Sequence, residues 1–204
     1  MAGTRARADD RTLVLHLRPA LELDERQFTA LARQNPDLRL ERTEEGDVLV
    51  MAPTGGDTGY RNAAITAQLW VWAMRDGTGA AFDSSTGFTL PNGATRSPDA
   101  TWVRAERLRA LTAEQRERFL PLCPDFVLGL RSPSDSLAAT QAKMEEYLAN
   151  GALLGWLLDV PSRRVSVYRP DTPTIYLDAP ASLLADPELP GFLLDLAPIW
   201  TPHF

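Results

Sequence analysis

The sequence predicts one mixed α/β domain built around a central sheet. Segments with strand character alternate with segments of helical periodicity, and FVLGLR at 126–131 is apolar on both faces, as in a strand covered from both sides. No internal repeat or low-complexity linker divides the chain, and 204 residues suffice for one domain with a substantial core. We therefore expect a flexible N-terminal tail at 1–11 and a single domain at 12–204.

Up to residue 119 the chain supplies three strand segments, a hairpin and three helical segments. TLVLHLR at 12–18 has strand character, and 23–36 predicts a helix that Asn35-Pro36 terminates. The segment 37–53 predicts a β-hairpin with its turn at Glu45-Gly46-Asp47. An apolar stripe at helical spacing predicts a second helix over 59–77, which ends at a glycine. Strand-like segments follow at 81–93 and 97–104, and 105–119 is helical in pattern.

The second half begins with the doubly apolar strand and continues with a helix. Leu137, Met144 and Leu148 form the expected buried stripe of this helix, which ends at Asn150-Gly151. Further strands are predicted at 153–160, 163–170 and 174–180, before a closing apolar segment at 189–200. This order of elements is that of a mixed α/β domain.

Composition limits the classes of function. The formal net charge is −6 and the isoelectric point is near 5.0, which argues against constitutive coating of nucleic acid but permits a small basic cleft. No apolar run is long enough to span a membrane, and the polar N-terminus lacks the apolar core of a secretory signal. The single cysteine, Cys123, indicates a reducing compartment, so we predict a cytoplasmic protein.

The common catalytic signatures are missing from the sequence. The only histidines are His16 and His203, and neither belongs to a nucleophile motif or to a zinc motif. What remains is a set of carboxylates near strand ends and one lysine, Lys143, in a chain otherwise rich in arginine. Carboxylates of this kind suit a hard, oxygen-ligated cation such as Mg²⁺ acting on phosphate.

Three segments carry a resemblance to a known family: SPDATWV at 97–103, CPDFVLGLRSPSDS at 123–136 and QAKMEEYLANGALLGWLLDV at 141–160. Their order and spacing, with MAPTGGDTGYRN upstream, resemble the Uma-type endonuclease family of the PD-(D/E)xK superfamily. The resemblance extends from about residue 12 to the C-terminus. It implies a restriction-endonuclease-like fold, in which helices flank a central mixed sheet.

The resemblance also implies an activity and a set of site residues. The activity is hydrolysis of DNA phosphodiester bonds with Mg²⁺ or Mn²⁺, by a homodimer. Asp99 matches the metal-binding aspartate, Lys143 the catalytic lysine, and Gln141 a polar neighbour in the catalytic set. Asp57 occupies a position where an acidic residue often precedes the first long helix, so it is a candidate auxiliary metal ligand.

One position departs from the family pattern. Gly129 stands where the strand normally carries a glutamate, the second metal-binding carboxylate. Asp125 and Glu146 are two carboxylates that could substitute for it, Glu146 the better in direction. Three hypotheses therefore stay open: an active but impaired endonuclease, an inactive nuclease fold that serves as a binding or assembly module, and an unrelated hydrolase or small-molecule binder.

Overall fold

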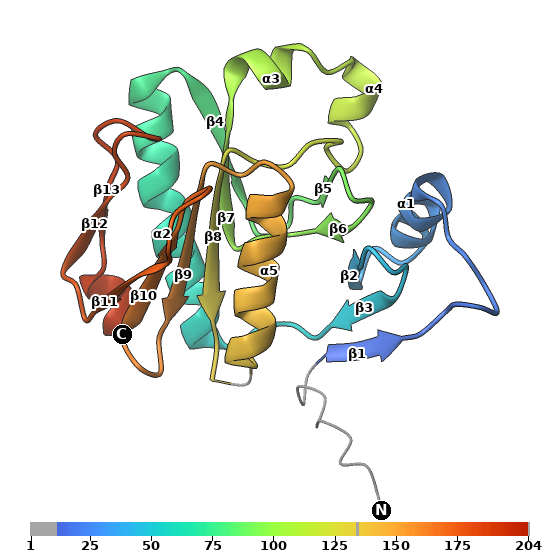
Figure 1. Cartoon of the computed structure of the whole chain (residues 1–204), viewed down its shortest axis with the longest axis horizontal. Helices are drawn as coiled ribbons and strands as arrows, with labels where there is room; N and C mark the ends of the chain where they lie inside the picture. The colour runs from blue at the N-terminus through green and yellow to red at the C-terminus, as the bar shows by residue number, and fades with distance from the viewer. Residues whose placement is uncertain (1–11, 134, 204) are drawn as a thin grey trace, which may run out of the picture.

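The computed structural model describes residues 12–133 and 135–203, which form two main sheets, a small hairpin sheet and flanking helices (Figure 1). The larger sheet contains, in spatial order, β11 (Ile175–Asp178), β10 (Arg164–Tyr168), β9 (Leu154–Asp159), β8 (Phe126–Arg131), β7 (Ala100–Arg104) and β4 (Gly79–Asp83). Only β8 and β9 pair in parallel, so the sheet is mixed. The predicted mixed α/β fold class is confirmed.

The larger sheet is covered on both faces, as the apolar pattern of β8 predicts. Helix α2 (Gly56–Asp76) packs on one face, where Leu69 meets residues such as Leu128. Helix α5 (Leu137–Ala149) packs on the other, where Met144 meets residues such as Val127. Successive residues of β8 alternate between these two clusters, because side chains along a strand point to opposite faces.

The smaller sheet has five strands, in the order β1 (Thr12–Leu15), β3 (Val48–Met51), β2 (Arg39–Arg42), β6 (Thr95–Arg96) and β5 (Phe88–Thr89). The predicted hairpin is the antiparallel pair of β2 and β3. Helix α1 (Glu25–Gln34) begins with a capping box between Asp24 and Gln27, and its Phe28 is fully buried in the core of this sheet.

The remaining elements are short. Strands β12 (Ser182–Leu184) and β13 (Leu193–Asp195) form the hairpin sheet, and α6 (Ala197–Trp200) follows it and packs near α2. Within the described part of the chain, the helices are too short or too polar to cross a membrane.

Two predicted details are wrong. The helical segment 105–119 is two short helices, α3 (Ala105–Arg109) and α4 (Ala113–Arg116), because Thr112 begins a new capping box with Gln115. Leu137 is 38% exposed, since it begins α5 at the edge of the fold, and Tyr147 supplies the buried surface instead. The predicted tail at 1–11 lies outside the described residues.

Candidate active site

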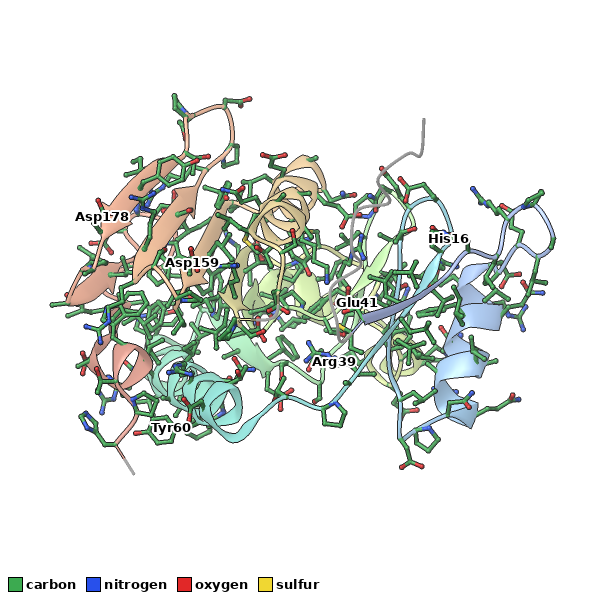
Figure 2. All side chains as sticks on the ribbon, turned by 90° about the horizontal axis from the view of Figure 1, so that it is seen from below. His16, Arg39, Glu41, Tyr60, Asp159 and Asp178 are labelled. Carbon is green, nitrogen blue, oxygen red and sulfur yellow. The ribbon has the colours of Figure 1, made fainter. Side chains whose placement is uncertain are left out.

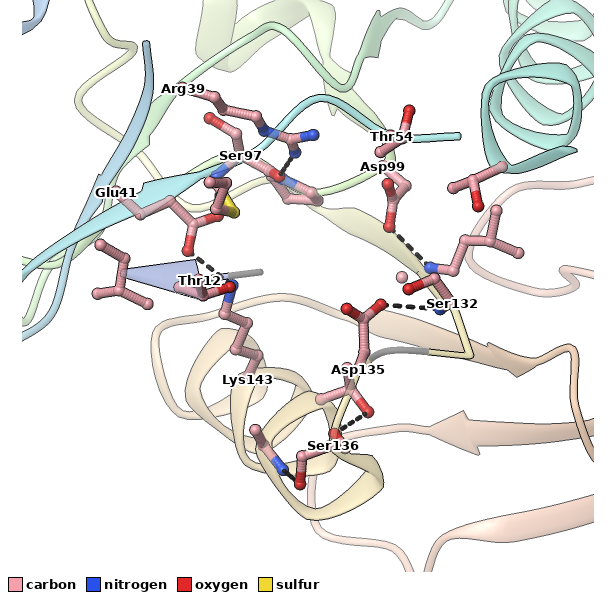
Figure 3. A pocket seen from close by; sticks show the side chains of 18 of the residues that line it. Thr12, Arg39, Glu41, Thr54, Ser97, Asp99, Ser132, Asp135, Ser136 and Lys143 are labelled. Carbon is pink, nitrogen blue, oxygen red and sulfur yellow. Dashed lines mark hydrogen bonds and ion pairs between the residues drawn. The ribbon is translucent and has the colours of Figure 1, made fainter. Parts of the chain in front are cut away.

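A cavity of about 460 Å³ lies where the two main sheets and helix α5 meet (Figure 3). One wall is a single face of the smaller sheet, because alternate residues of a strand share a side. This wall is formed by Thr12, Val14, Arg39, Glu41, Leu49 and Met51. The opposite wall comes from the residues just before β7, the end of β8 and the first turns of α5. Segments distant in sequence therefore converge at these strand ends.

Asp99 enters the cavity just before β7. Its carboxylate accepts a hydrogen bond of 2.7 Å from the Leu130 backbone N–H and one of 3.1 Å from the Asn62 side-chain amide. Burial raises the pKa of Asp99, against the lowering effects of the Leu130 N–H and of the nearby Arg39 guanidinium. Since a buried carboxylate is costly to keep charged, a cation at Asp99 would offset that cost.

The groups around Asp99 fit an oxygen-ligated cation that keeps most of its water. The side-chain oxygen of Asn62 is buried and has no hydrogen-bond partner among the described residues, a need that a cation or its water would satisfy. In residues 12–133 and 135–203, no three His, Cys, Asp or Glu side chains are grouped closely enough to form a complete protein-built site. Mg²⁺ commonly uses only one or two carboxylates, with water and substrate oxygens, so Asp99 and the neighbouring Asn62 are of the types that such a cation uses.

Lys143 reaches the edge of the cavity from α5, and its ammonium lies 2.7 Å from Glu41 Oε2. Glu41 is 1% exposed and also accepts from the Ser97 N–H at 3.2 Å and from Arg96 Nη1 at 3.3 Å. Arg96 in turn lies 2.6 Å from Glu146. We call these four side chains the charge cluster: Glu41, Lys143, Arg96 and Glu146.

The members of the charge cluster stabilise one another. Burial acts to raise the pKa of Glu41, but the charges of Lys143 and Arg96 outweigh it, so this pKa lies below its ordinary value. Burial also opposes the charge of Arg96, yet its hydrogen bond to Glu146 and the charge of Glu41 hold its pKa above the ordinary value. The buried carboxylate of Glu41 thus fixes the ammonium of Lys143 at the cavity.

Gly129 lines the cavity from β8, where the resemblance places a glutamate. A Cβ at this position would lie 3.2 Å from Cε of Met144 and 3.6 Å from Cδ1 of Leu157. Both atoms end a side chain, and a small rotation of the flexible Met144 would relieve the closer contact. A Cβ at position 129 therefore requires only a small movement of Met144.

Asp57 and Gln141 lie outside the cavity lining that the described residues form. The Asp57 side chain is 64% exposed in the first turn of α2, and it lies 3.6 Å from Arg61 Nη1. Gln141 is half-buried on α5. Of the four predicted site residues, the structure brings Asp99 and Lys143 together at one cavity.

The two carboxylates considered as substitutes for the strand glutamate are engaged elsewhere. Glu146 belongs to the charge cluster, and Asp125 lies just before β8, where it contacts Arg107 at 3.0 Å. Neither is part of the cavity lining formed by the described residues. Asp135 does line the cavity, and its carboxylate accepts a backbone N–H of its own loop at 2.8 Å.

Glu41, Arg39 and Asn62 are residues of the site that no sequence pattern singled out. Figure 2 shows Arg39 and Glu41 near the middle of the molecule, where the smaller sheet meets the rest of the fold. A usable signal exists in the strand RLER. A period of two places the charged Arg39 and Glu41 on one face of the strand and the apolar Leu40 on the other. Asn62 carries no such signal, since its role follows from the packing of α2 beside β7.

Other nucleophiles and bases are remote from this cavity. Cys123 is buried, and burial raises the pKa of its thiol to about 12. The ring of His16 is largely exposed and lies 2.7 Å from Asp47, and His203 is exposed near the C-terminus. In the part of the chain that is described, the chemistry available at the cavity is therefore that of carboxylates, a lysine, an arginine and hydroxyls.

Comparisons with known proteins bear on the family and the fold of this chain. No curated protein matches the chain. The chain is similar to a crystal structure from Anabaena variabilis described as "a putative nuclease belonging to DUF820", with a TM-score of 0.66, 19% sequence identity, and coverage of 79% of this chain and 89% of that one. This likeness shows a shared fold. The Uma2 family model, described as "Putative restriction endonuclease", matches residues 26–197 and supports a nuclease-like function. The chain therefore belongs to the Uma2 family.

Proposed function

We propose that this protein is a metal-dependent endonuclease that hydrolyses phosphodiester bonds of DNA at the cavity of Asp99 and Lys143. The observation that carries the proposal is the convergence of the half-buried carboxylate of Asp99 and the ammonium of Lys143 on one cavity, with the Asn62 amide hydrogen-bonded to that carboxylate. Membership in the Uma2 family supports the choice of nucleic acid as substrate.

Each residue has a distinct role in the proposed reaction. Asp99, held by Leu130 and Asn62, presents a fixed carboxylate as the ligand for Mg²⁺ or Mn²⁺. The bound ion would polarise the phosphoryl group and favour ionisation of the attacking water. Lys143, held by Glu41, adds positive charge that offsets the negative charge developing on the phosphate. Hydrolysis joins the water oxygen to phosphorus and releases one sugar oxygen as an alcohol.

Gly129 supports a second candidate, an inactive nuclease fold that serves as a binding or assembly module. Without a carboxylate at this position, the cation has fewer protein ligands, and a metal's contribution to lowering the barrier is several kcal/mol. Position 129 makes this candidate testable, because the close contact of a Cβ there is with the end of the flexible Met144 side chain.

Cleavage of supercoiled and single-stranded DNA in Mg²⁺ or Mn²⁺ separates the two candidates. We expect slow cleavage by the wild type, a loss of roughly a hundredfold or more in Asp99→Asn, and an increase of roughly tenfold or more in Gly129→Glu. Asp99→Asn is a close match because an amide oxygen can still accept the Leu130 N–H. Glu145→Gln, an exposed change on α5, is the control and should cleave as the wild type does.

The outcomes assign the function. Cleavage that Asp99→Asn abolishes supports the endonuclease. Cleavage that appears only in Gly129→Glu supports a nuclease fold that this glycine has inactivated. The absence of cleavage by the wild type and by every variant, with intact folding by circular dichroism, contradicts the endonuclease proposal.

We also propose a homodimer, on the ground that restriction-like nucleases commonly pair two subunits to cut both strands. Sedimentation equilibrium with and without DNA tests this part. A monomer under both conditions contradicts it.

A further inference from the structure

Arg39 is a cavity-lining arginine that the protein leaves short of acceptors. Its guanidinium carries five N–H donors, and one hydrogen bond is made, from Nη2 to the Ser97 carbonyl oxygen at 2.7 Å. Its Nε is buried without a partner among the described residues. No carboxylate of the described chain lies within 4.0 Å of this guanidinium. An arginine with unused donors at a cavity can bind an anionic ligand, because charge-assisted hydrogen bonds to an oxyanion are strong.

This shortage is specific to Arg39. Two other arginines of the same sheet, Arg42 and Arg96, are more deeply buried than the half-buried Arg39. Arg42 donates to two backbone carbonyls, at 2.6 and 2.8 Å. Arg96 contacts two carboxylates, Glu146 and Glu41, at 2.6 and 3.3 Å. The sheet therefore satisfies its structural arginines, and the one that faces the cavity is the one left open.

The surroundings of Arg39 fit an oxyanion. The second cation of the cavity, Lys143, is already paired with Glu41. Hydroxyl groups that can also donate to an oxyanion line the same space, from Thr12, Thr54 and Ser97. A volume of about 460 Å³ falls in the range of ordinary ligand sites. Figure 3 shows Arg39 reaching past Ser97 on the side of the cavity where Asp99 also lies.

We propose that Arg39 binds a phosphate group of the polynucleotide backbone, through donors that the protein leaves unused. Strand β2 then supplies the anion-binding part of the site, and the segment before β7 supplies the carboxylate part. The choice of a polynucleotide rests on the proposed function, whereas binding of phosphate by Arg39 does not. Arg39 also holds Ser97, so the test must separate phosphate binding from a structural role.

Binding without turnover provides that separation. The affinity for a fluorescein-labelled single-stranded DNA oligonucleotide is measured in EDTA at several salt concentrations, for wild type, Arg39→Gln, Arg39→Lys and Arg26→Gln. Arg26, exposed on α1, is the charge-matched control. Arg39→Gln should weaken binding roughly tenfold or more, and the slope of log Kd against log salt should fall by about one. Arg39→Lys should keep the slope and recover part of the affinity. Arg26→Gln should change the affinity by less than about twofold.

A second measurement follows the wild-type protein itself, and a variant serves only to assign one signal. Inorganic phosphate is titrated into ¹⁵N-labelled protein while the arginine Nε–H signals are followed, with sodium acetate and sodium chloride as parallel titrations. Arg39→Lys identifies the Arg39 signal. We expect a saturable shift of this signal with phosphate and little change with the other two salts.

The outcomes separate this proposal from the proposed function. Equal affinity and equal salt slope for Arg39→Gln and Arg26→Gln, or an Arg39 signal indifferent to phosphate, would overturn the phosphate site. An equal response to acetate would overturn its assignment to phosphate. A phosphate response without oligonucleotide binding would uphold the oxyanion site while contradicting the nuclease function.

Discussion

Two groups of polar side chains at the cavity differ in how completely the protein satisfies their hydrogen-bonding and charge requirements. In the charge cluster, which we call the satisfied side, Glu41 has three partners and its buried charge is balanced. In the second group, which we call the unsatisfied side, Arg39 and Asn62 leave buried polar atoms without partners among the described residues, and burial raises the pKa of Asp99. We infer that the satisfied side holds the cavity in shape, whereas the unsatisfied side has polar atoms available to bind a ligand.

Breaking the satisfied side should have the largest effect on stability. Glu41→Gln removes a buried charge and leaves Lys143 and Arg96 without their shared partner. We expect the free energy of unfolding to fall by about 3 kcal/mol, as when one member of a buried ion pair is lost. Urea denaturation at pH 7 measures this loss. Exposed Glu145→Gln should stay within about 0.5 kcal/mol of the wild type, and a loss in Glu41→Gln no larger than this would show that the charge cluster is dispensable.

The unsatisfied side should respond to pH with the opposite sign. Because burial raises the pKa of Asp99, the folded state binds this proton more tightly, and the ionised group destabilises the fold above that pKa. In metal-free buffer, Asp99→Asn should therefore be more stable than wild type at pH 7. The advantage should shrink as the pH falls and wild-type Asp99 becomes protonated. Urea midpoints between pH 7 and pH 3 test this, and an Asp99→Asn variant less stable at pH 7 would contradict it.

The stability of Glu41→Gln should also depend on pH. Its pKa is lowered in the fold, since its ion pairs outweigh the effect of burial, so its favourable contribution is present above the unfolded pKa. That contribution is lost as the pH falls through the folded pKa. At pH 7, Glu41→Gln should thus be less stable than the wild type, whereas Asp99→Asn should be more stable. Both differences in unfolding free energy should shrink as the pH falls. Differences of the same sign for both variants at pH 7 would mean that the two sides of the cavity do not differ as described.

Much of the fold follows from local patterns that tertiary contacts do not override. The doubly apolar pattern of β8 predicts its central place, and glycine with positive φ at Gly77 ends α2 as expected. The strands β6 and β12 have two and three residues, too few for a periodic signal, so no pattern could reveal them. Leu137 fits the apolar stripe of α5, but the stripe cannot indicate where the neighbouring sheet ends.

The site divides in the same way. Asp99 and Lys143 are predicted by the order and spacing of whole segments, and the structure places both at one cavity. Glu41 and Arg39 are visible in the sequence only as charged residues on a short hairpin strand. Their importance depends on which face of that strand meets the second sheet, and this is settled by packing between segments far apart in the chain.

The smallest expected effect concerns Gly129, where the unsatisfied side lacks a side chain altogether. Gly129→Ala places a Cβ 3.2 Å from the terminal methyl of Met144, which can rotate away, and it also reduces the entropy of the unfolded chain. We expect a change in unfolding free energy within about 1 kcal/mol of zero.

Gly79→Ala in β4 of the same sheet is the matched contrast, because its Cβ would lie 2.4 Å from the Val103 carbonyl oxygen and 2.4 Å from the Trp102 ring. That variant should lose about 3 kcal/mol. If urea denaturation instead gave similar large losses for both, β8 would need glycine for packing, and the missing carboxylate would be a requirement of the fold. If only Gly129→Ala left the unfolding free energy nearly unchanged, packing would not require this glycine, and its presence would have to be explained by the function of the cavity.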